Sequence, residues 1–184
     1  MRSDGLLLNR RSLLRTAGAL GLAATGVFAR ARANDLHLGQ TAPPATLVTL
    51  DGQKLSTPDL VGHVVILTFW ATWCVPCREE LPLLSKYASE HAPQGLQVLG
   101  FSLDLPDDLK DVRAVAQTLS FPVGLLAQSS APGYGRIWRL PVNFTIDRDG
   151  RLVDDGWRAK KPVWTQERLD SIVTPLLTRS KQLS

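Results

Sequence analysis

The sequence predicts an α/β fold in which a central mixed β-sheet is flanked by helices. Two observations support this fold class. Segments with strand-like and helix-like patterns alternate from residue 64 onward and lead to a final pair of strands and a last helix. Residues 64–70 are apolar at every position except Thr68, as expected of a strand that is covered on both faces. We therefore place residues 64–70 at the centre of the sheet.

A helix is predicted directly after this strand, over residues 74–91, because apolar residues recur there at spacings of three and four: Cys77, Leu81, Leu84 and Ala88. Turn residues and changes of period delimit the other elements. In chain order we expect an N-terminal hairpin formed by residues 45–50 and the segment around Leu55, a helical turn at 57–60, a strand at 97–102, a helix at 107–119, a strand at 121–126, a short helix at 133–139, an antiparallel hairpin of 142–146 with 151–155, and a closing helix at 165–178.

Both cysteines of the chain lie at the junction between the central strand and its helix, in the order Cys74-Val75-Pro76-Cys77. A thiolate at Cys74 would face the free N–H groups and the positive end of the helix dipole, which predicts a lowered pKa. Cys77 follows one turn later on the same face, within reach of a disulfide. Pro76 suits the first helical turn. The pattern predicts a redox-active pair in which Cys74 attacks and Cys77 resolves.

Two other uses of the cysteines are alternatives to redox chemistry. A zinc site needs two further ligands, and the histidines, at positions 37, 63 and 91, have no ligand-pair spacing, so we predict no metal site. A purely structural disulfide would close a very small loop and would therefore stabilise the fold little. Reaction chemistry is the expected role.

Residues 69–82 carry a specific resemblance. Their order, Phe-Trp-Ala-Thr-Trp-Cys-Val-Pro-Cys-Arg-Glu-Glu-Leu-Pro, resembles the active-site signature of the thioredoxin superfamily, and within it that of the TlpA/ResA-like thiol-disulfide oxidoreductases of the bacterial envelope, which are related to the AhpC/TSA redoxins. The resemblance implies a thioredoxin-like fold with an N-terminal β-hairpin and a helix-strand insertion, and it implies no cofactor. A related peroxidase would have threonine three residues before the cysteine, where this chain has Ala71.

The resemblance also implies a substrate groove. Leu140-Pro141 resembles the segment in which family members hold a cis-proline opposite the dithiol, and the backbone of Leu140 would pair there with an extended substrate. Trp73 and Pro76 would line the same groove, with Trp70 and Trp73 shaping its rim. One departure stands out, because Trp138-Arg139 replaces the Arg-Gly that is common in the family and makes the groove bulkier.

Disulfide exchange needs a group that handles the proton of the resolving thiol. Thioredoxins keep a buried aspartate in the central strand, and the matching position here is Thr68, which cannot titrate. Glu80, three residues after Cys77, is the expected substitute, as in ResA-like members. The alternative is that Glu79 and Glu80 are solvated acids favoured by the helix dipole.

The N-terminus predicts export. Residues 9–15 resemble a twin-arginine motif, and an apolar stretch at 17–29 precedes the small-residue site 31–33. We expect a cleavable signal peptide over 1–33 and a thioredoxin-like domain over 34–184 located in the periplasm, with a retained membrane anchor as the alternative. Six of the 21 basic residues and one of the 17 acidic residues lie in 1–33, which leaves 15 basic and 16 acidic residues. This near neutrality excludes an electrostatic case for nucleic-acid binding.

The expected function is therefore that of an exported, monomeric thiol-disulfide oxidoreductase. Family resemblance suggests that it reduces protein disulfides in the envelope, such as those of apocytochrome c or copper-site cysteines, with electrons from a membrane-embedded donor. Two alternatives stay open at this point. A copper metallochaperone would hold Cu(I) between the two thiolates, and a redox-inert module would bind peptides in the groove beside Pro141.

Overall fold

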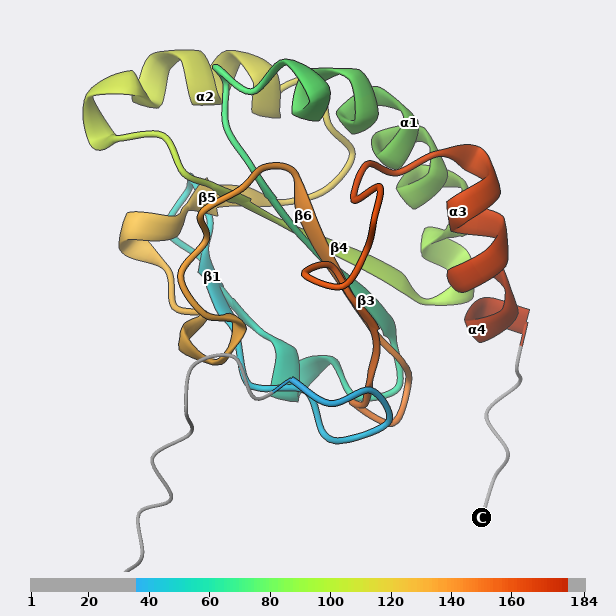
Figure 1. Ribbon diagram of the computed structural model, residues 1–184. Coiled ribbons are helices and arrows are strands. Elements are labelled where there is room, and N and C mark those ends of the chain that lie inside the picture. The colour runs from blue at the N-terminus through green and yellow to red at the C-terminus, as the bar shows by residue number, and fades with distance from the viewer. Residues whose placement is uncertain (1–35, 179–184) are drawn as a thin grey trace, which may run out of the picture. The chain divides into compact units, whose positions relative to one another are not determined.

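The strands β3 (Val64–Trp70) and β4 (Leu96–Ser102) pair in parallel near the centre of a five-stranded sheet. β5 (Val123–Leu125) pairs in parallel with β4, whereas β6 (Val142–Ile146) pairs antiparallel with β3 and with the edge strand β7 (Leu152–Asp155). The order across the sheet is β5-β4-β3-β6-β7. This computed structural model, which describes residues 36–178, confirms the predicted mixed sheet (Figure 1).

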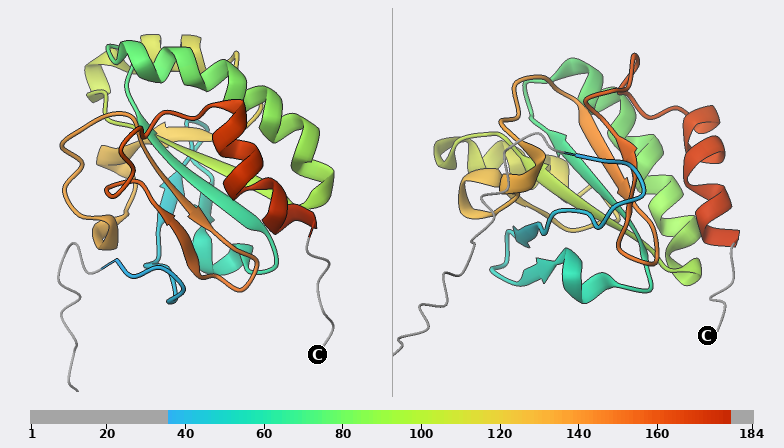
Figure 2. Two further views of the ribbon diagram at one scale, coloured as in Figure 1. Left: turned by 45° about the vertical axis from the view of Figure 1, so that its right-hand side comes forward. Right: turned by 60° about the horizontal axis from the view of Figure 1, so that its bottom comes forward.

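One face of the sheet is covered by α-helices. α1 (Val75–His91), α2 (Leu109–Ala116), α3 (Gln166–Ile172) and α4 (Thr174–Thr178) all contribute buried side chains to the core on this face. α1 and α3 lie side by side over the sheet (Figures 1 and 2). The apolar stripe predicted for α1 is confirmed, because Cys77, Leu81, Leu84 and Ala88 are all buried there.

The other face of the sheet packs against the N-terminal segment and the loops around Tyr134. The predicted N-terminal hairpin is present as the antiparallel pair β1 (Thr46–Val48) and β2 (Lys54–Ser56). β1 approaches β5 so closely that a Cβ at Gly124 would lie 1.9 Å from the carbonyl oxygen of Val48. Glycine is therefore required at this position.

Short 3-10 helices connect the main elements. The predicted helical turn at 57–60 is η1, and the others follow at the ends of α1 and β4 and after β5: η1 (Thr57–Leu60), η2 (Ala92–Gln94), η3 (Pro106–Asp108), η4 (Leu126–Gln128) and η5 (Pro132–Tyr134). The helix predicted over 107–119 is thus divided into η3 and α2. The strand predicted over 121–126 is shorter, because η4 begins at Leu126.

Two predicted helices differ from the structure. The short helix expected over 133–139 is wrong, because only η5 forms there and Gly135 follows with a φ of 79°, outside the helical region. The closing helix is divided into α3 and α4 after Ile172. Pro175 explains this division, since it has no N–H to continue the helical hydrogen bonds and its ring crowds the preceding turn.

The predicted signal peptide, residues 1–33, lies outside the described residues. Across 36–178, none of the helices is both long enough and apolar enough to cross a bilayer.

Candidate active site

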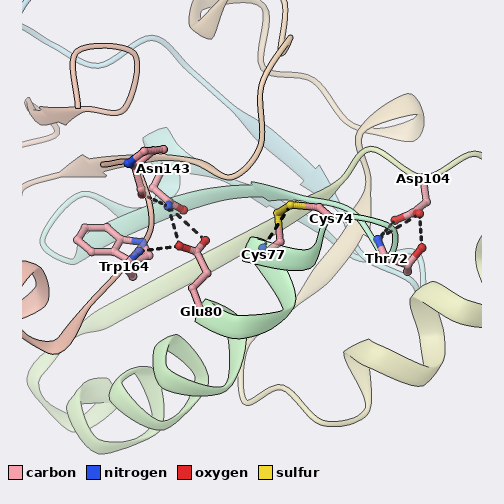
Figure 3. The surroundings of a disulfide bond; sticks show 8 residues. Thr72, Cys74, Cys77, Glu80, Asp104, Asn143 and Trp164 are labelled. Carbon is pink, nitrogen blue, oxygen red and sulfur yellow. Dashed lines mark hydrogen bonds between the residues drawn. A yellow bond between two sulfur atoms is a disulfide. The ribbon is translucent and has the colours of Figure 1, made fainter. Parts of the chain in front are cut away.

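Cys74 and Cys77 lie where β3 passes into α1. Cys74 is the residue that caps the N-terminus of α1, and its Sγ accepts a hydrogen bond from the backbone N–H of Cys77 at 3.3 Å. The two sulfurs form a disulfide (Figure 3). Pro76 lies in the first helical turn, where an N–H has no partner in the helix. The structure therefore places the cysteine pair at the strand-to-helix junction expected from the sequence.

The two sulfurs differ in access. Cys74 is 5% exposed and lines a surface groove, whereas Cys77 is completely buried beneath it. A substrate can therefore reach only the Cys74 side of the disulfide. A thiolate at Cys74 would accept the Cys77 N–H and face the positive end of the α1 dipole, and both effects favour the charged form.

The groove beside Cys74 has a volume of about 400 Å³. It brings together the predicted residues Trp73, Pro76 and Leu140 with Cys74, and Pro141 follows Leu140 through a cis peptide bond, as expected. The full lining comprises Trp73, Cys74, Val75, Pro76, Leu103, Ile137, Trp138, Arg139 and Leu140. The groove is thus mostly apolar and opens directly onto the sulfur of Cys74.

Glu80 lies one turn after Cys77 on α1 and points into the protein (Figure 3). It is 1% exposed, whereas its neighbour Glu79 is exposed. The alternative of a solvated acid therefore holds for Glu79 and is wrong for Glu80, which is buried. Burial raises the pKa of Glu80 to about 7, although hydrogen bonds from Trp164 and Asn143 and the charge of Arg168 act in the opposite direction. This carboxyl group can gain or lose a proton near neutral pH.

The partners of Glu80 come from distant parts of the chain. The backbone N–H of Trp164 donates to Oε2 at 2.6 Å, and Nδ2 of Asn143 donates to Oε1 at 3.3 Å. Asn143 lies on β6 directly opposite Thr68 of β3. The same amide nitrogen of Asn143 also donates to the carbonyl of Pro162 at 3.0 Å, which ties the loop before α3 to the sheet. Sequence reasoning identified neither contact to Glu80.

Arg168 of α3 contacts the loop before α3, which carries Pro162 and Trp164. Its guanidinium group lies 4.3 Å from the ring centre of Trp164 and donates to the carbonyl of Pro162 at 2.8 Å. It also forms an ion pair of 2.6 Å with Asp154 of β7. These contacts close the loop over Glu80, which accounts for the burial of the carboxyl group.

A second polar cluster lies on the other side of the disulfide (Figure 3). Asp104, which is buried just after β4, accepts hydrogen bonds from the backbone N–H of Thr72 at 3.0 Å and from its hydroxyl at 2.6 Å. The hydroxyl of Ser102 donates at 2.6 Å to Oδ2, the carboxylate oxygen that also accepts the N–H of Thr72. Asp104 thus anchors the turn that leads into Cys74. The sequence does contain a signal for Asp104, namely an acidic residue two positions after the apolar strand β4, but sequence reasoning missed it.

With this geometry established, similarity to known proteins identifies the family. Residues 38–154 match the AhpC/TSA family. Thiol-disulfide oxidoreductase ResA of Bacillus thuringiensis (strain Al Hakam) is 30% identical over 155 residues, which cover 84% of this chain and 88% of that protein. The chain belongs to the AhpC/TSA family. Within it, the chain is a ResA-like protein of the thioredoxin superfamily and a thiol-disulfide oxidoreductase.

Other relatives agree with this assignment. Thioredoxin-like protein YneN of Bacillus subtilis (strain 168) is 36% identical over 118 residues, covering 63% of this chain and 69% of that protein. Among solved structures, a thiol:disulfide interchange protein of the thioredoxin family from Chlorobium tepidum TLS superposes with a TM-score of 0.61 at 27% identity, covering 78% of this chain and 99% of the other. The thioredoxin-like fold is thereby confirmed.

The ResA-like chain differs from expectation at Trp70. We predicted that Trp70 would help to shape the rim of the groove, and this is wrong, because Trp70 is fully buried in the core on the α1 side of the sheet. Side chains alternate along β3, and Trp70 lies on the same face as Ile66. Of the two tryptophans Trp70 and Trp73, Trp73, which is 66% exposed, is the one that lines the groove.

Potential metal ligands are dispersed in this structure. Within 36–178, no three side chains of His, Cys, Asp or Glu gather closely enough to hold a metal ion. Cu(I) binding of the kind considered above would therefore depend on the two sulfurs of Cys74 and Cys77 alone.

Proposed function

We propose that this thiol-disulfide oxidoreductase is exported and reduces disulfides of envelope proteins through Cys74 and Cys77. The observation that carries the proposal is that Cys74 lines the surface groove, whereas Cys77 is completely buried and Glu80 is buried one turn further along α1. Export is supported by the twin-arginine motif at residues 9–15 and the small residues at 31–33. The cysteines of apocytochrome c or of copper sites are the proposed substrates, on the strength of the family resemblance.

The reaction runs from the reduced dithiol to the disulfide seen in the structure. The Cys74 thiolate attacks one sulfur of the substrate disulfide, and the other substrate sulfur leaves as a thiolate. Cys77, once deprotonated, attacks the sulfur of Cys74 and releases the second substrate thiol. Two electrons have then passed to the substrate, and the Cys74–Cys77 disulfide has formed. A dithiol of a membrane-embedded reductase returns the protein to its reduced form.

Glu80 is the group that accepts the proton of the Cys77 thiol. The resolving thiol is enclosed by protein, so bulk water cannot take its proton directly. A carboxyl group with a pKa of about 7, one helical turn away, is suited to accept it at neutral pH. Glu80 thus carries out the proton transfer that Thr68, without a titratable group, cannot.

The backbone of Leu140 is positioned to form hydrogen bonds with the substrate backbone. It lines the groove with Cys74 and lies just outside β6. Neither its N–H nor its carbonyl forms a hydrogen bond with another residue of the described part of the chain. An extended substrate segment could therefore pair with Leu140, in the manner of an added strand, and present its cysteine to Cys74.

The proposal predicts different results for the two cysteine variants in the bacterium that encodes the protein. Cys77→Ser should accumulate mixed disulfides with substrates, because Cys74 still attacks but nothing resolves the adduct. Cys74→Ser should accumulate none. Non-reducing gels and mass spectrometry of periplasmic fractions identify the adducts. Adducts confined to the cytoplasm would contradict export, and equal trapping by both variants would contradict the assigned roles.

A further inference from the structure

We propose that Trp138 is a specificity-determining residue, which binds an apolar and preferably aromatic side chain next to the reacting cysteine of the substrate. The proposal rests on the proposed function, because it concerns the groove beside Cys74. It assigns the substrate a chemical class, namely an extended polypeptide segment whose cysteine has an apolar neighbour.

Trp138 is 72% exposed, although it lines the same groove as Cys74. A tryptophan ring left in water forgoes the free energy that burial would provide, so this ring adds little to the stability of the fold. Trp73 and Val75, on the Cys74 side of the groove, are also more than half exposed. An incoming apolar side chain would therefore remove several apolar surfaces from water at once.

The ring of Trp138 is held in place by its neighbours. Its ring stacks on the ring of Trp157 with a centroid distance of 5.6 Å and an interplanar angle of 10°. The indole N–H of Trp157 in turn donates to the carbonyl of Tyr134 at 2.8 Å. A ring fixed before binding loses less conformational entropy when a ligand packs against it.

Arg139 completes this support. Its guanidinium carbon lies 5.5 Å from the ring centre of Trp138 and 5.6 Å from that of Trp157. Its Nη2 donates to the carbonyls of Gly156 at 2.5 Å and Trp157 at 2.8 Å. Arg139 therefore contacts the loop at Gly156 and Trp157 and both tryptophan rings. Its Nη2 group is already hydrogen-bonded within the protein.

The lining of the groove is mostly apolar. Arg139 is the one charged residue among the described residues that line the groove, and no carboxylate lines it. A positively charged substrate side chain would lose water there without gaining an ion pair, which is unfavourable, and the Nη2 group of Arg139 already donates to two backbone carbonyls. An aromatic side chain would instead gain stacking contacts with Trp138 and burial against Trp73. The occupant that fits best is thus an apolar segment of a substrate protein in extended form.

The experiment uses the full chain in its reduced form and two short peptides that differ only in the residue next to a single cysteine, phenylalanine in one and serine in the other. Each cysteine carries a 5-thio-2-nitrobenzoate group as a mixed disulfide. Cys74 attacks the peptide sulfur and releases the coloured thiolate, and Cys77 then releases the peptide thiol. The absorbance change gives the second-order rate constant for each peptide.

The wild-type protein should react about fivefold faster with the phenylalanine peptide than with the serine peptide, within the range that an aromatic pair contributes. Trp138→Ala should reduce this ratio to below about twofold, and Trp138→Phe should restore it. Val61→Ala is the matched control, because Val61 is an exposed apolar residue before the start of β3, at the opposite end from Cys74, and it should leave the ratio unchanged.

A small symmetrical disulfide, 5,5'-dithiobis(2-nitrobenzoate), tests the thiol chemistry of Cys74 and Cys77 separately from the role of Trp138. Val61→Ala should reduce it at the wild-type rate, and the Trp138 variants should still reduce it to completion, because attack by Cys74 does not require the indole ring. Far-UV circular dichroism shows that each variant is folded. A wild-type protein that fails to reduce it would overturn the proposed thiol chemistry. Normal reduction of this compound combined with equal rates for the two peptides, or with a preference that survives in Trp138→Ala, would overturn the role of Trp138 alone.

Discussion

Glu80 shows how burial changes the chemistry of a single residue. Adjacent glutamates at positions 79 and 80 are equivalent by type, yet only Glu80 lies beneath the loop that carries Trp164. Loss of hydration raises its pKa to about 7, against 4.5 for an ordinary glutamate. The side chain is therefore protonated over part of the range in which a solvated glutamate is fully charged.

This shift predicts a pH-dependent stability difference between Glu80→Gln and the wild type, both in the disulfide form. Below about pH 4.5 the carboxyl group is protonated in the folded and unfolded chains, and its stabilising contribution is fully present. As the pH rises from about 4.5 to about 7, the carboxyl group of the unfolded chain loses its proton while that of the folded chain keeps it. The unfolded state is thereby favoured, and the free energy of unfolding falls by about 3 kcal/mol in total. Glutamine does not titrate. The unfolding free energy of Glu80→Gln relative to wild type should therefore rise by about this amount from pH 4 to pH 8.

Denaturant unfolding at a series of pH values measures this difference. Glu79→Gln is the matched control, because Glu79 is exposed on the same turn of α1, and its difference from wild type should stay nearly constant. A constant difference for Glu80→Gln as well would show that Glu80 titrates like a solvated acid.

At the scale of elements, the turn between β3 and α1 is held from the neighbouring strand. Asp104 follows β4, which is parallel to β3, so the ends of both strands meet at one edge of the sheet. The carboxylate receives two hydrogen bonds from Thr72 and one from Ser102. The position of Cys74, two residues after Thr72, therefore depends on β4 as well as on its own strand.

Asp104→Asn tests this anchor. An amide can accept at only one of its two terminal atoms, so at least one buried donor loses its partner, and we expect a destabilisation of about 2 kcal/mol. The rate at which Cys74 reduces 5,5'-dithiobis(2-nitrobenzoate) should fall as well, because the turn before it is no longer fixed. Thermal unfolding and the reduction assay provide the two measurements. Asp107→Asn, an exposed change in η3, should alter neither, and an unaffected Asp104→Asn would show that β3 and α1 position Cys74 by themselves.

At the scale of the whole molecule, the sheet brings together parts of the site that are distant in sequence. Cys74 and Cys77 come from the β3–α1 junction, Asn143 from β6, and Trp164 from the loop before α3. Leu140 and Trp138 approach the same junction from the segment before β6. Both the surroundings of the proposed proton acceptor and the groove beside Cys74 therefore depend on the complete fold.

The reduction potential is the property of the whole molecule that decides the direction of electron flow. We expect a value below about −200 mV, in the range of reducing thioredoxins. Equilibration with glutathione or dithiothreitol buffers, followed by tryptophan fluorescence, measures it, because the exposed Trp73 adjoins Cys74. A value near about −120 mV would instead describe an oxidant and would overturn the reductive role, while leaving the exchange chemistry of the two cysteines intact.

The sequence alone was sufficient for the central strand, the helix that follows it and the cysteine pair between them. These features depend on local patterns: an apolar run, a period of three to four residues, and a proline in the first helical turn. The hairpins were predictable for the same reason. Local patterns failed at 133–139, where Gly135 takes a conformation outside the helical region.

Tertiary structure decided which polar and aromatic side chains serve the site. Glu80 and Glu79 have the same local sequence environment, and the contact that distinguishes them comes from Trp164, 84 residues away. Asn143 reaches Glu80 across 63 residues, and no local pattern marked it. Solvation and pKa depend on what covers a group, and that is set by how distant segments pack. The sequence by itself therefore determined the proposed reacting sulfurs, whereas the fold determined their access, the burial of the proposed proton acceptor Glu80 and the aromatic wall of the groove.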